Sequence, residues 1–70
     1  MSRRKKQYEI KYGILDCLEN YPMKSSQLAN KIGTNQETVE RHLEELQALH
    51  KVQQVKVQIR GEEKDRWQLV

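Results

Sequence analysis

The sequence predicts an α+β fold in which three helices are followed by a β-hairpin. Three observations lead to this prediction. Apolar residues recur with the 3.6-residue period of a helix in successive segments up to about residue 49. A glycine and a helix start signal separate the second of these segments from the third. After residue 50 the apolar period changes to two, which is typical of a strand with one buried face.

The first helix is expected from about Gln7 to Asn20. Its apolar residues follow one helical face: Ile10, Ile14, Cys17, Leu18 and Tyr21. Tyr8 and Tyr12 flank that face. Pro22 ends the helix, because its ring disfavours the helical conformation of the preceding residue. Residues 1–6 form a basic polar arm with nothing to bury, and we expect it to be flexible, whereas residues 7–70 form one domain.

The second and third helices form a helix–turn–helix pattern. Ser25 or Ser26 can cap the second helix, and Gly33 can end it, since glycine adopts the left-handed conformation without steric cost. Thr34 and Glu37 predict a capping box at the start of the third helix. The residues expected to face the core are Leu28, Ala29 and Ile32, then Val39, Leu43, Leu46 and Leu49.

The hairpin is expected between residue 55 and residue 69. Its first strand alternates polar residues with three residues expected to face the core, Val55, Val57 and Ile59. Residues 60–65 form a charged turn around Gly61. Trp67 alternates in phase with Leu69 in the returning strand, so we expect its indole in the core or at the root of the hairpin.

Composition excludes several classes of protein. A chain of 70 residues with 36% hydrophobic residues builds one small core. It has no apolar run of membrane-spanning length and no signal-peptide core. Cys17 is the single cysteine, which excludes an internal disulfide and fits a reducing compartment, and its place in the first helix predicts an inert thiol. A cytoplasmic protein is therefore expected.

Catalytic and metal-binding patterns are missing from the sequence. The two histidines, His42 and His50, lie two helical turns apart without a cysteine pair, and no glycine-rich phosphate loop is present. We therefore expect no enzymatic activity, no metal, no cofactor and no small-molecule ligand.

Charge is unevenly distributed along the chain, whose net charge is +3. Residues 1–12 carry five cations and one carboxylate, a net +4, whereas residues 34–50 carry four carboxylates and one arginine, a net −3. Residues 51–70 carry five cations and three carboxylates, a net +2. Both ends can therefore be attracted to a polyanion, while the third helix is acidic.

From about Gln7 onward the chain resembles a minimal winged helix-turn-helix domain of small bacterial and archaeal transcriptional regulators, broadly similar to MarR- and ArsR-type domains. The matching segments are Leu28–Gly33, Thr34–Leu46 and the hairpin end Trp67–Leu69. One departure is His50, at a joint where such domains often have glycine. Histidine can adopt the left-handed conformation, although less readily than glycine.

The resemblance implies double-stranded DNA as the partner, with the third helix in the major groove. Arginine can bond guanine in a fork, and asparagine or glutamine can pair with adenine, so the candidates for base contact are Asn35, Gln36, Thr38 and Arg41. The candidates for phosphate contact are Arg60 and Lys64 in the wing, Lys24 and Lys31 near helix ends, and Arg3, Arg4, Lys5 and Lys6 in the arm. A single small domain buries only about 600–1,000 Å² on DNA, so a homodimer through the first helix or the wing edge, or a partner protein, is also expected.

Two other functions stay open. The carboxylates of Glu37, Glu40 and Glu44 repel phosphates, which suits shallow insertion of the first turn or a protein–protein module that docks a basic partner. A nucleoid-type protein would bind DNA without sequence preference. The salt dependence of binding distinguishes a protein module from both DNA-binding functions.

Overall fold

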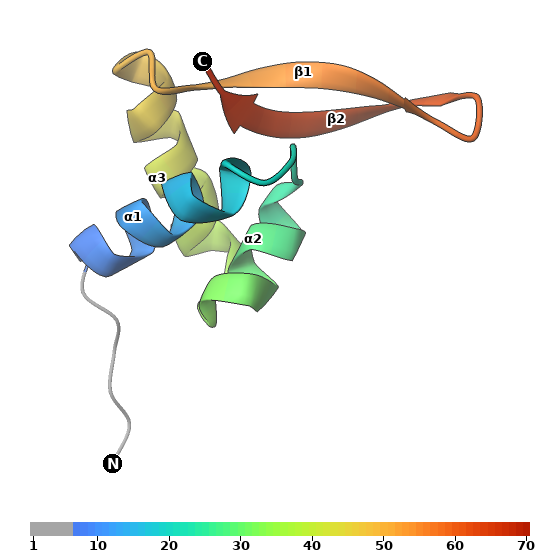
Figure 1. Cartoon of the computed structure of the whole chain (residues 1–70). Coiled ribbons are helices and arrows are strands. Elements are labelled where there is room, and N and C mark those ends of the chain that lie inside the picture. The colour runs from blue at the N-terminus through green and yellow to red at the C-terminus, as the bar shows by residue number, and fades with distance from the viewer. Residues whose placement is uncertain (1–6) are drawn as a thin grey trace.

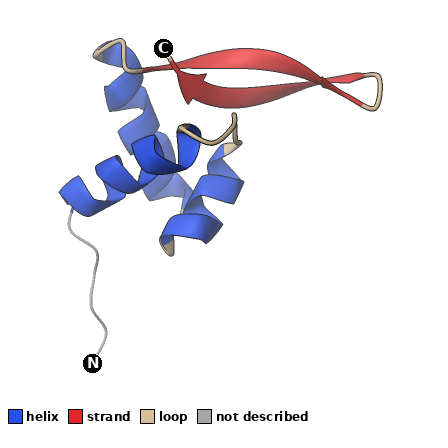
Figure 2. Cartoon of the chain, in the orientation of Figure 1, coloured by secondary structure: helices blue, strands red, loops and turns tan. Residues whose placement is uncertain are grey.

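The computed structural model describes residues 7–70 and contains three helices followed by an antiparallel hairpin, as the sequence predicts. The elements are α1 (Gln7–Leu18), α2 (Ser25–Ile32), α3 (Gln36–Ala48), β1 (Val52–Ile59) and β2 (Glu62–Leu69). The three helices gather into one body, and the hairpin extends from that body to one side, beyond α2 (Figure 1). Figure 2 shows the same division into a helical part and a projecting pair of strands.

One face of each helix supplies the core, as the apolar periodicity predicts. The buried apolar residues are Ile10, Ile14 and Leu18 of α1, Leu28 and Ala29 of α2, Val39, Leu43 and Leu46 of α3, and Met23 and Val52 outside the helices. Cys17 is half-buried and packs against this core. Where α1 meets α2, a Cβ added to Gly13 would lie 3.2 Å from Cγ1 of Ile32, so the two helices approach closely at the glycine.

The hairpin is fastened to the helical body at its root. The strands pair from Val52 opposite Leu69 to Ile59 opposite Glu62. On the other side of β2, the Met23 N–H donates to the Trp67 carbonyl at 3.0 Å, and the Trp67 N–H donates to the Met23 carbonyl at 2.8 Å. Trp67 also packs against the core, which confirms its prediction as a core or root residue. β2 therefore lies between β1 and the helical body (Figure 1).

The prediction of which face of β1 lies on the core is wrong. Val52 is a core residue, and side chains alternate along a strand, so Gln54 shares the inward face of β1. Val55, Val57 and Ile59 lie on the opposite face; the two valines are half-buried and Ile59 is 39% exposed. The predicted period of two is correct, but its phase is set by Val52, which lies outside the predicted strand.

Two residues of the predicted apolar stripes lie at the surface. Tyr21 is 48% exposed and Leu49 is 58% exposed. Leu49 comes directly after α3 and Tyr21 three residues after the end of α1, where the helical phase no longer fixes the direction of the side chain. Beyond α3, His50 has φ of 60°, which confirms that a histidine can supply the left-handed joint.

The predicted cap of α2 is wrong by one residue. Lys24, not Ser25 or Ser26, is the N-cap residue, and its N–H donates to Oε1 of Gln27 at 3.3 Å. The serines lie inside the first turn, because the chain stays extended through Lys24, next to the Met23 bridge to β2. The predicted end of the helix is correct: Gly33 takes φ of 87°.

Candidate nucleic-acid interface

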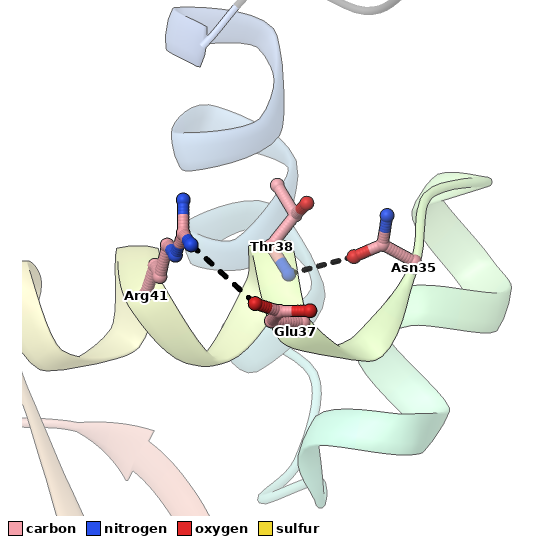
Figure 3. Close-up of polar contacts among 4 residues, drawn as sticks. All are labelled: Asn35, Glu37, Thr38 and Arg41. Atoms are coloured by element: carbon pink, nitrogen blue, oxygen red, sulfur yellow. Dashed lines mark hydrogen bonds and ion pairs between the residues drawn. The ribbon is translucent and has the colours of Figure 1, made fainter.

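The first turn of α3 is closed by the side chain of Asn35. This N-cap residue has an extended backbone, and its Oδ1 accepts from the Thr38 N–H at 2.8 Å (Figure 3). The predicted capping box between Thr34 and Glu37 is wrong, because the Thr34 N–H donates to the Ala29 carbonyl at 3.1 Å in the turn after α2. Asn35 therefore uses its side-chain oxygen to hold the helix.

The other candidates for base contact lie along the solvent side of α3, where side chains bond to one another. Nη2 of Arg41 lies 3.4 Å from Oε1 of Glu37 (Figure 3), and Nε2 of Gln36 donates to Oε1 of Glu40 at 3.1 Å. Both members of the Arg41 pair are 79% exposed, so the pair contributes only about 0.3–0.5 kcal/mol. A stronger partner can therefore displace it. Thr38 is half-buried.

The same side of α3 is acidic. The helix carries Glu37, Glu40, Glu44 and Glu45 against the single cation Arg41, a net −3, and all four carboxylates are exposed. Carboxylates facing a phosphate backbone repel it. Polar contacts are therefore available at the N-terminal turn of α3, and repulsion increases along the rest of the helix.

α2, α3 and the hairpin meet at a groove of about 430 Å³. Its lining residues are Lys24, Ser25, Glu40, Glu44, Gln54, Asp65 and Trp67. The Ser25 hydroxyl donates to Oε1 of Glu40 at 3.3 Å and links the first turn of α2 to α3. The groove places the predicted phosphate contact Lys24 on the same surface as the solvent side of α3. Asp65 and Trp67 were not predicted on this surface, because alternation in β2 places them on one strand face but does not tell which elements that face meets.

Two residues with positive φ form the tip of the hairpin. Arg60 has φ of 53° and Gly61 has φ of 80°, as in a two-residue type I′ turn. The turn is therefore shorter than the predicted segment 60–65, and β2 begins at Glu62. The tight turn holds Arg60 at the far end of the wing, whereas Nζ of Lys64 lies 2.9 Å from Oε2 of Glu62. Of the two predicted wing contacts, Arg60 is the one without a carboxylate partner among residues 7–70.

Lys31 lies at a different place from these residues. It is in the last turn of α2, beside a hollow lined also by Asp16, Cys17, Glu19 and Asn20. Asp16 and Glu19 line the same hollow, and phosphate contact by Lys31 stays a prediction. The four predicted contacts of the arm, Arg3, Arg4, Lys5 and Lys6, lie outside the described residues.

The burial of His42 was not predicted. Its residue is only 6% exposed, and its Nδ1 lies 3.6 Å from Oε2 of Glu45, beyond hydrogen-bond distance, with no hydrogen-bond partner within residues 7–70. His42 follows the core residue Val39 by three positions, a spacing that shares a helix face and could have indicated burial.

In the described chain, no group of three or more His, Cys, Asp or Glu residues could hold a metal ion. Nor does this part of the chain contain a helix long and apolar enough to cross a membrane.

Comparisons with known proteins agree with this architecture, although no protein-family model and no curated protein matches the chain. The Zalpha domain of Carassius auratus PKZ, in complex with Z-DNA, is 26% identical with a TM-score of 0.70, over 91% of this chain and 97% of that one. The apo-Zalpha domain of zebrafish PKZ is 28% identical with a TM-score of 0.71, over 91% and 95% of the two chains. A mutant of Lactococcus lactis ZitR is 15% identical with a TM-score of 0.78, over all of this chain and 49% of its own.

These likenesses establish the fold class. The chain has a winged-helix fold, with three helices followed by a two-stranded antiparallel wing. The likeness to ZitR, at 15% identity, shows the fold alone. The assignment to MarR- or ArsR-type regulators stays a prediction, because the two structures of higher identity are Zalpha domains.

Proposed function

We propose that this chain binds double-stranded DNA, with the first turn of α3 and the wing facing the duplex. The observation that carries the proposal is the likeness to a Zalpha domain in complex with Z-DNA, because it extends over 91% of this chain at 26% identity. α2, α3 and the wing meet at one groove and so present a common surface to a duplex, although Glu40, Glu44 and Asp65 in that groove repel phosphates. Phosphate contact is the main source of affinity in such complexes.

Lys24 and Arg60 are the proposed phosphate contacts of the described chain. Lys24 is exposed at the N-terminus of α2, where the helix dipole and unpaired N–H groups also favour an anion. Arg60 is exposed at the wing tip. Neither side chain has a carboxylate partner within residues 7–70, so neither has to release one to bind a phosphate.

The finer proposal is a sequence-specific transcriptional regulator acting in the cytoplasm. Arg41 is the first candidate for base readout, because its weak pair with Glu37 can exchange for the two acceptors of a guanine. Glu40 can accept from the amino group of cytosine. The carboxylate of Glu44 lies a turn further along, which favours shallow insertion of the first turn of α3.

Fluorescence anisotropy with a labelled duplex tests the phosphate contacts. We expect Lys24→Ala and Arg60→Ala to weaken binding on every sequence and to lower the salt slope by about one phosphate each. Lys51→Ala is the matched control, since Lys51 follows the C-terminus of α3 and lies about 20 Å from its first turn. Equal effects of all three substitutions would contradict the proposed orientation.

Duplexes held in the B form and in the Z form are titrated in parallel. The ratio of the two affinities measures the preference of this chain for one helical form of DNA.

A base-pair substitution series with Arg41→Ala separates a regulator from a nucleoid-type protein. A base-reading Arg41 should lose about 1–3 kcal/mol of discrimination at one position of the preferred site. A protein without sequence preference should bind all members of the series equally, with or without Arg41.

The second candidate is a protein-binding module that uses the groove between α3 and the wing. The observation that favours it is the position of three carboxylates, Glu40, Glu44 and Asp65, around that groove beside Trp67. In this case the partner is basic, and the chain fails to bind DNA even at low salt.

A further inference from the structure

The outer edge of β1 has no pairing partner in the described chain. Trp67 directs its N–H and carbonyl to Met23, away from β1. In an antiparallel pair the residue opposite directs its groups outward as well, so the N–H and carbonyl of Gln54 point to the outer edge of β1. Alternation along the strand gives Lys56 and Gln58 the same direction. A sheet edge of this kind is a template for another strand.

The face of β1 that points away from the helical body carries an apolar stripe. Val55, Val57 and Ile59 lie on it, and none of them belongs to the core or packs against it. An apolar stripe beside an open edge can continue onto a second strand that adds there, because side chains of paired strands lie face to face.

The sequence of β1 is complementary to itself in one antiparallel register. With a two-fold axis at Val57, that residue faces its own copy, Val55 faces Ile59, and Lys56 faces Gln58. Every apolar residue of the stripe then meets another, and the outward backbone groups of Lys56 and Gln58 pair. An axis one position earlier would instead place Lys56 opposite itself, and like charges in that position are destabilising.

We propose that two copies of this chain associate through β1 in this register and form a four-stranded sheet of two wings. The ammonium of Lys56 does not oppose the pairing strongly, since it lies 3.4 Å from Oδ1 of Asp65 on β2. The outer edge of β2 does not offer an equivalent surface, because Met23 covers it at Trp67 and the outward positions beyond are the acidic residues Glu63 and Asp65. One open edge per chain closes the assembly at two copies.

Sedimentation equilibrium of the full chain tests the dimer, and proline at residue 58 tests the edge. Gln58→Pro removes an outward N–H and leaves the bonds between β1 and β2 in place, so the variant should fold and have the mass of one chain. Gln58→Ala keeps that N–H and should keep the mass of two chains. Circular dichroism checks that both variants keep the wild-type fold. A wild-type chain that stays single up to millimolar concentration, or a Gln58→Pro variant that still dimerises, would overturn the proposal.

Two cysteine variants test the register without depending on dimer stability. In a Cys17→Ala background, Val57→Cys places the two thiols at the axis, where the Cα atoms of a non-hydrogen-bonded pair lie about 4.5 Å apart, within disulfide range. Val55→Cys, on the same face, lies about 14 Å from its own copy. Mild oxidation should cross-link the first variant and not the second. Equal yields from both, or a dimer in which Val57→Cys does not cross-link, would assign the contact to another surface.

Discussion

Asn35 fixes the start of α3 and therefore the position of every candidate contact on that helix. We predict that Asn35→Ala lowers the free energy of unfolding by about 1 kcal/mol, because the Thr38 N–H loses its acceptor at 2.8 Å. Urea denaturation measures the change. Asn35→Asp keeps a side-chain acceptor and should retain most of the stability. Thr34→Ala should change stability by less than about 0.5 kcal/mol. A loss as large as that of Asn35→Ala would instead support the capping box predicted at Thr34.

His42 is a buried polar residue on an otherwise apolar face. We predict that His42→Leu leaves the stability unchanged or raises it, because a group of similar size replaces an Nδ1 without a hydrogen-bond partner within residues 7–70. Leu43→Ala, at the next position, should lower stability by about 2–5 kcal/mol, which is most of what a domain of this size has. Thermal and urea unfolding of the two variants provide the comparison. A loss of more than about 1 kcal/mol in His42→Leu would show that the contact with Glu45 matters.

At the residue scale, the core could be predicted and the N-caps could not. Ile14, Leu43 and their neighbours repeat every three or four positions, and a helix turns that pattern into one buried face. Thr34 and Asn35 are both good N-cap residues, so the pattern alone cannot separate them. The choice depends on the Thr34 N–H, which the turn after Gly33 has already paired.

The contact between α1 and α2 is tight at Gly13. Alanine at this position favours the helix by about 0.5–1 kcal/mol, but its Cβ would meet Cγ1 of Ile32 at 3.2 Å. We therefore predict a near-zero change in stability for Gly13→Ala alone, and a clear gain for the same substitution in an Ile32→Ala background. A double-mutant cycle measures the coupling between the two residues. An equal effect in both backgrounds would show that the two helices do not meet at this point.

The wing turn holds Arg60 in a conformation that asparagine adopts more readily. We predict that Arg60→Asn raises the stability of the domain by up to about 1 kcal/mol, because Asn-Gly is the preferred pair for a type I′ turn. The same substitution should weaken DNA binding if Arg60 contacts a phosphate. Thermal unfolding and anisotropy of Arg60→Asn and Arg60→Lys separate the two effects, since lysine keeps the charge. Unchanged stability of Arg60→Asn would contradict strain in the turn. Unchanged DNA affinity would contradict a phosphate contact by Arg60.

At the element scale, the order and type of all five elements followed from the helical periodicity, the signals between α2 and α3, and the change of period after residue 50. The orientation of the wing did not follow from it. A period of two leaves two phases, and hydrophobicity favours the phase that carries Val55, Val57 and Ile59. The structure buries the other phase, because Val52 and Trp67 attach the root of the wing to the core while the rest of the strand projects into solvent.

At the scale of the whole molecule, the described chain separates its charges. The solvent side of α3 is acidic, whereas Lys24 and Arg60 lie at the two other elements that border the same side. The sequence predicted these charges and their elements, since both are read along the chain. It could not predict the groove, because Glu40, Asp65 and Trp67 come together only through the bridge between Met23 and β2.

The salt dependence of DNA binding by the wild-type chain tests the central proposal most directly. A labelled random-sequence duplex is titrated by anisotropy at several salt concentrations from about 50 to 200 mM. Contacts to several phosphates predict clear binding at low salt and a loss of affinity of at least about tenfold across this range, linear in the logarithm of the salt concentration. No binding at about 50 mM salt, on either B-form or Z-form duplex, would contradict DNA binding and direct attention to a basic protein partner for the acidic groove.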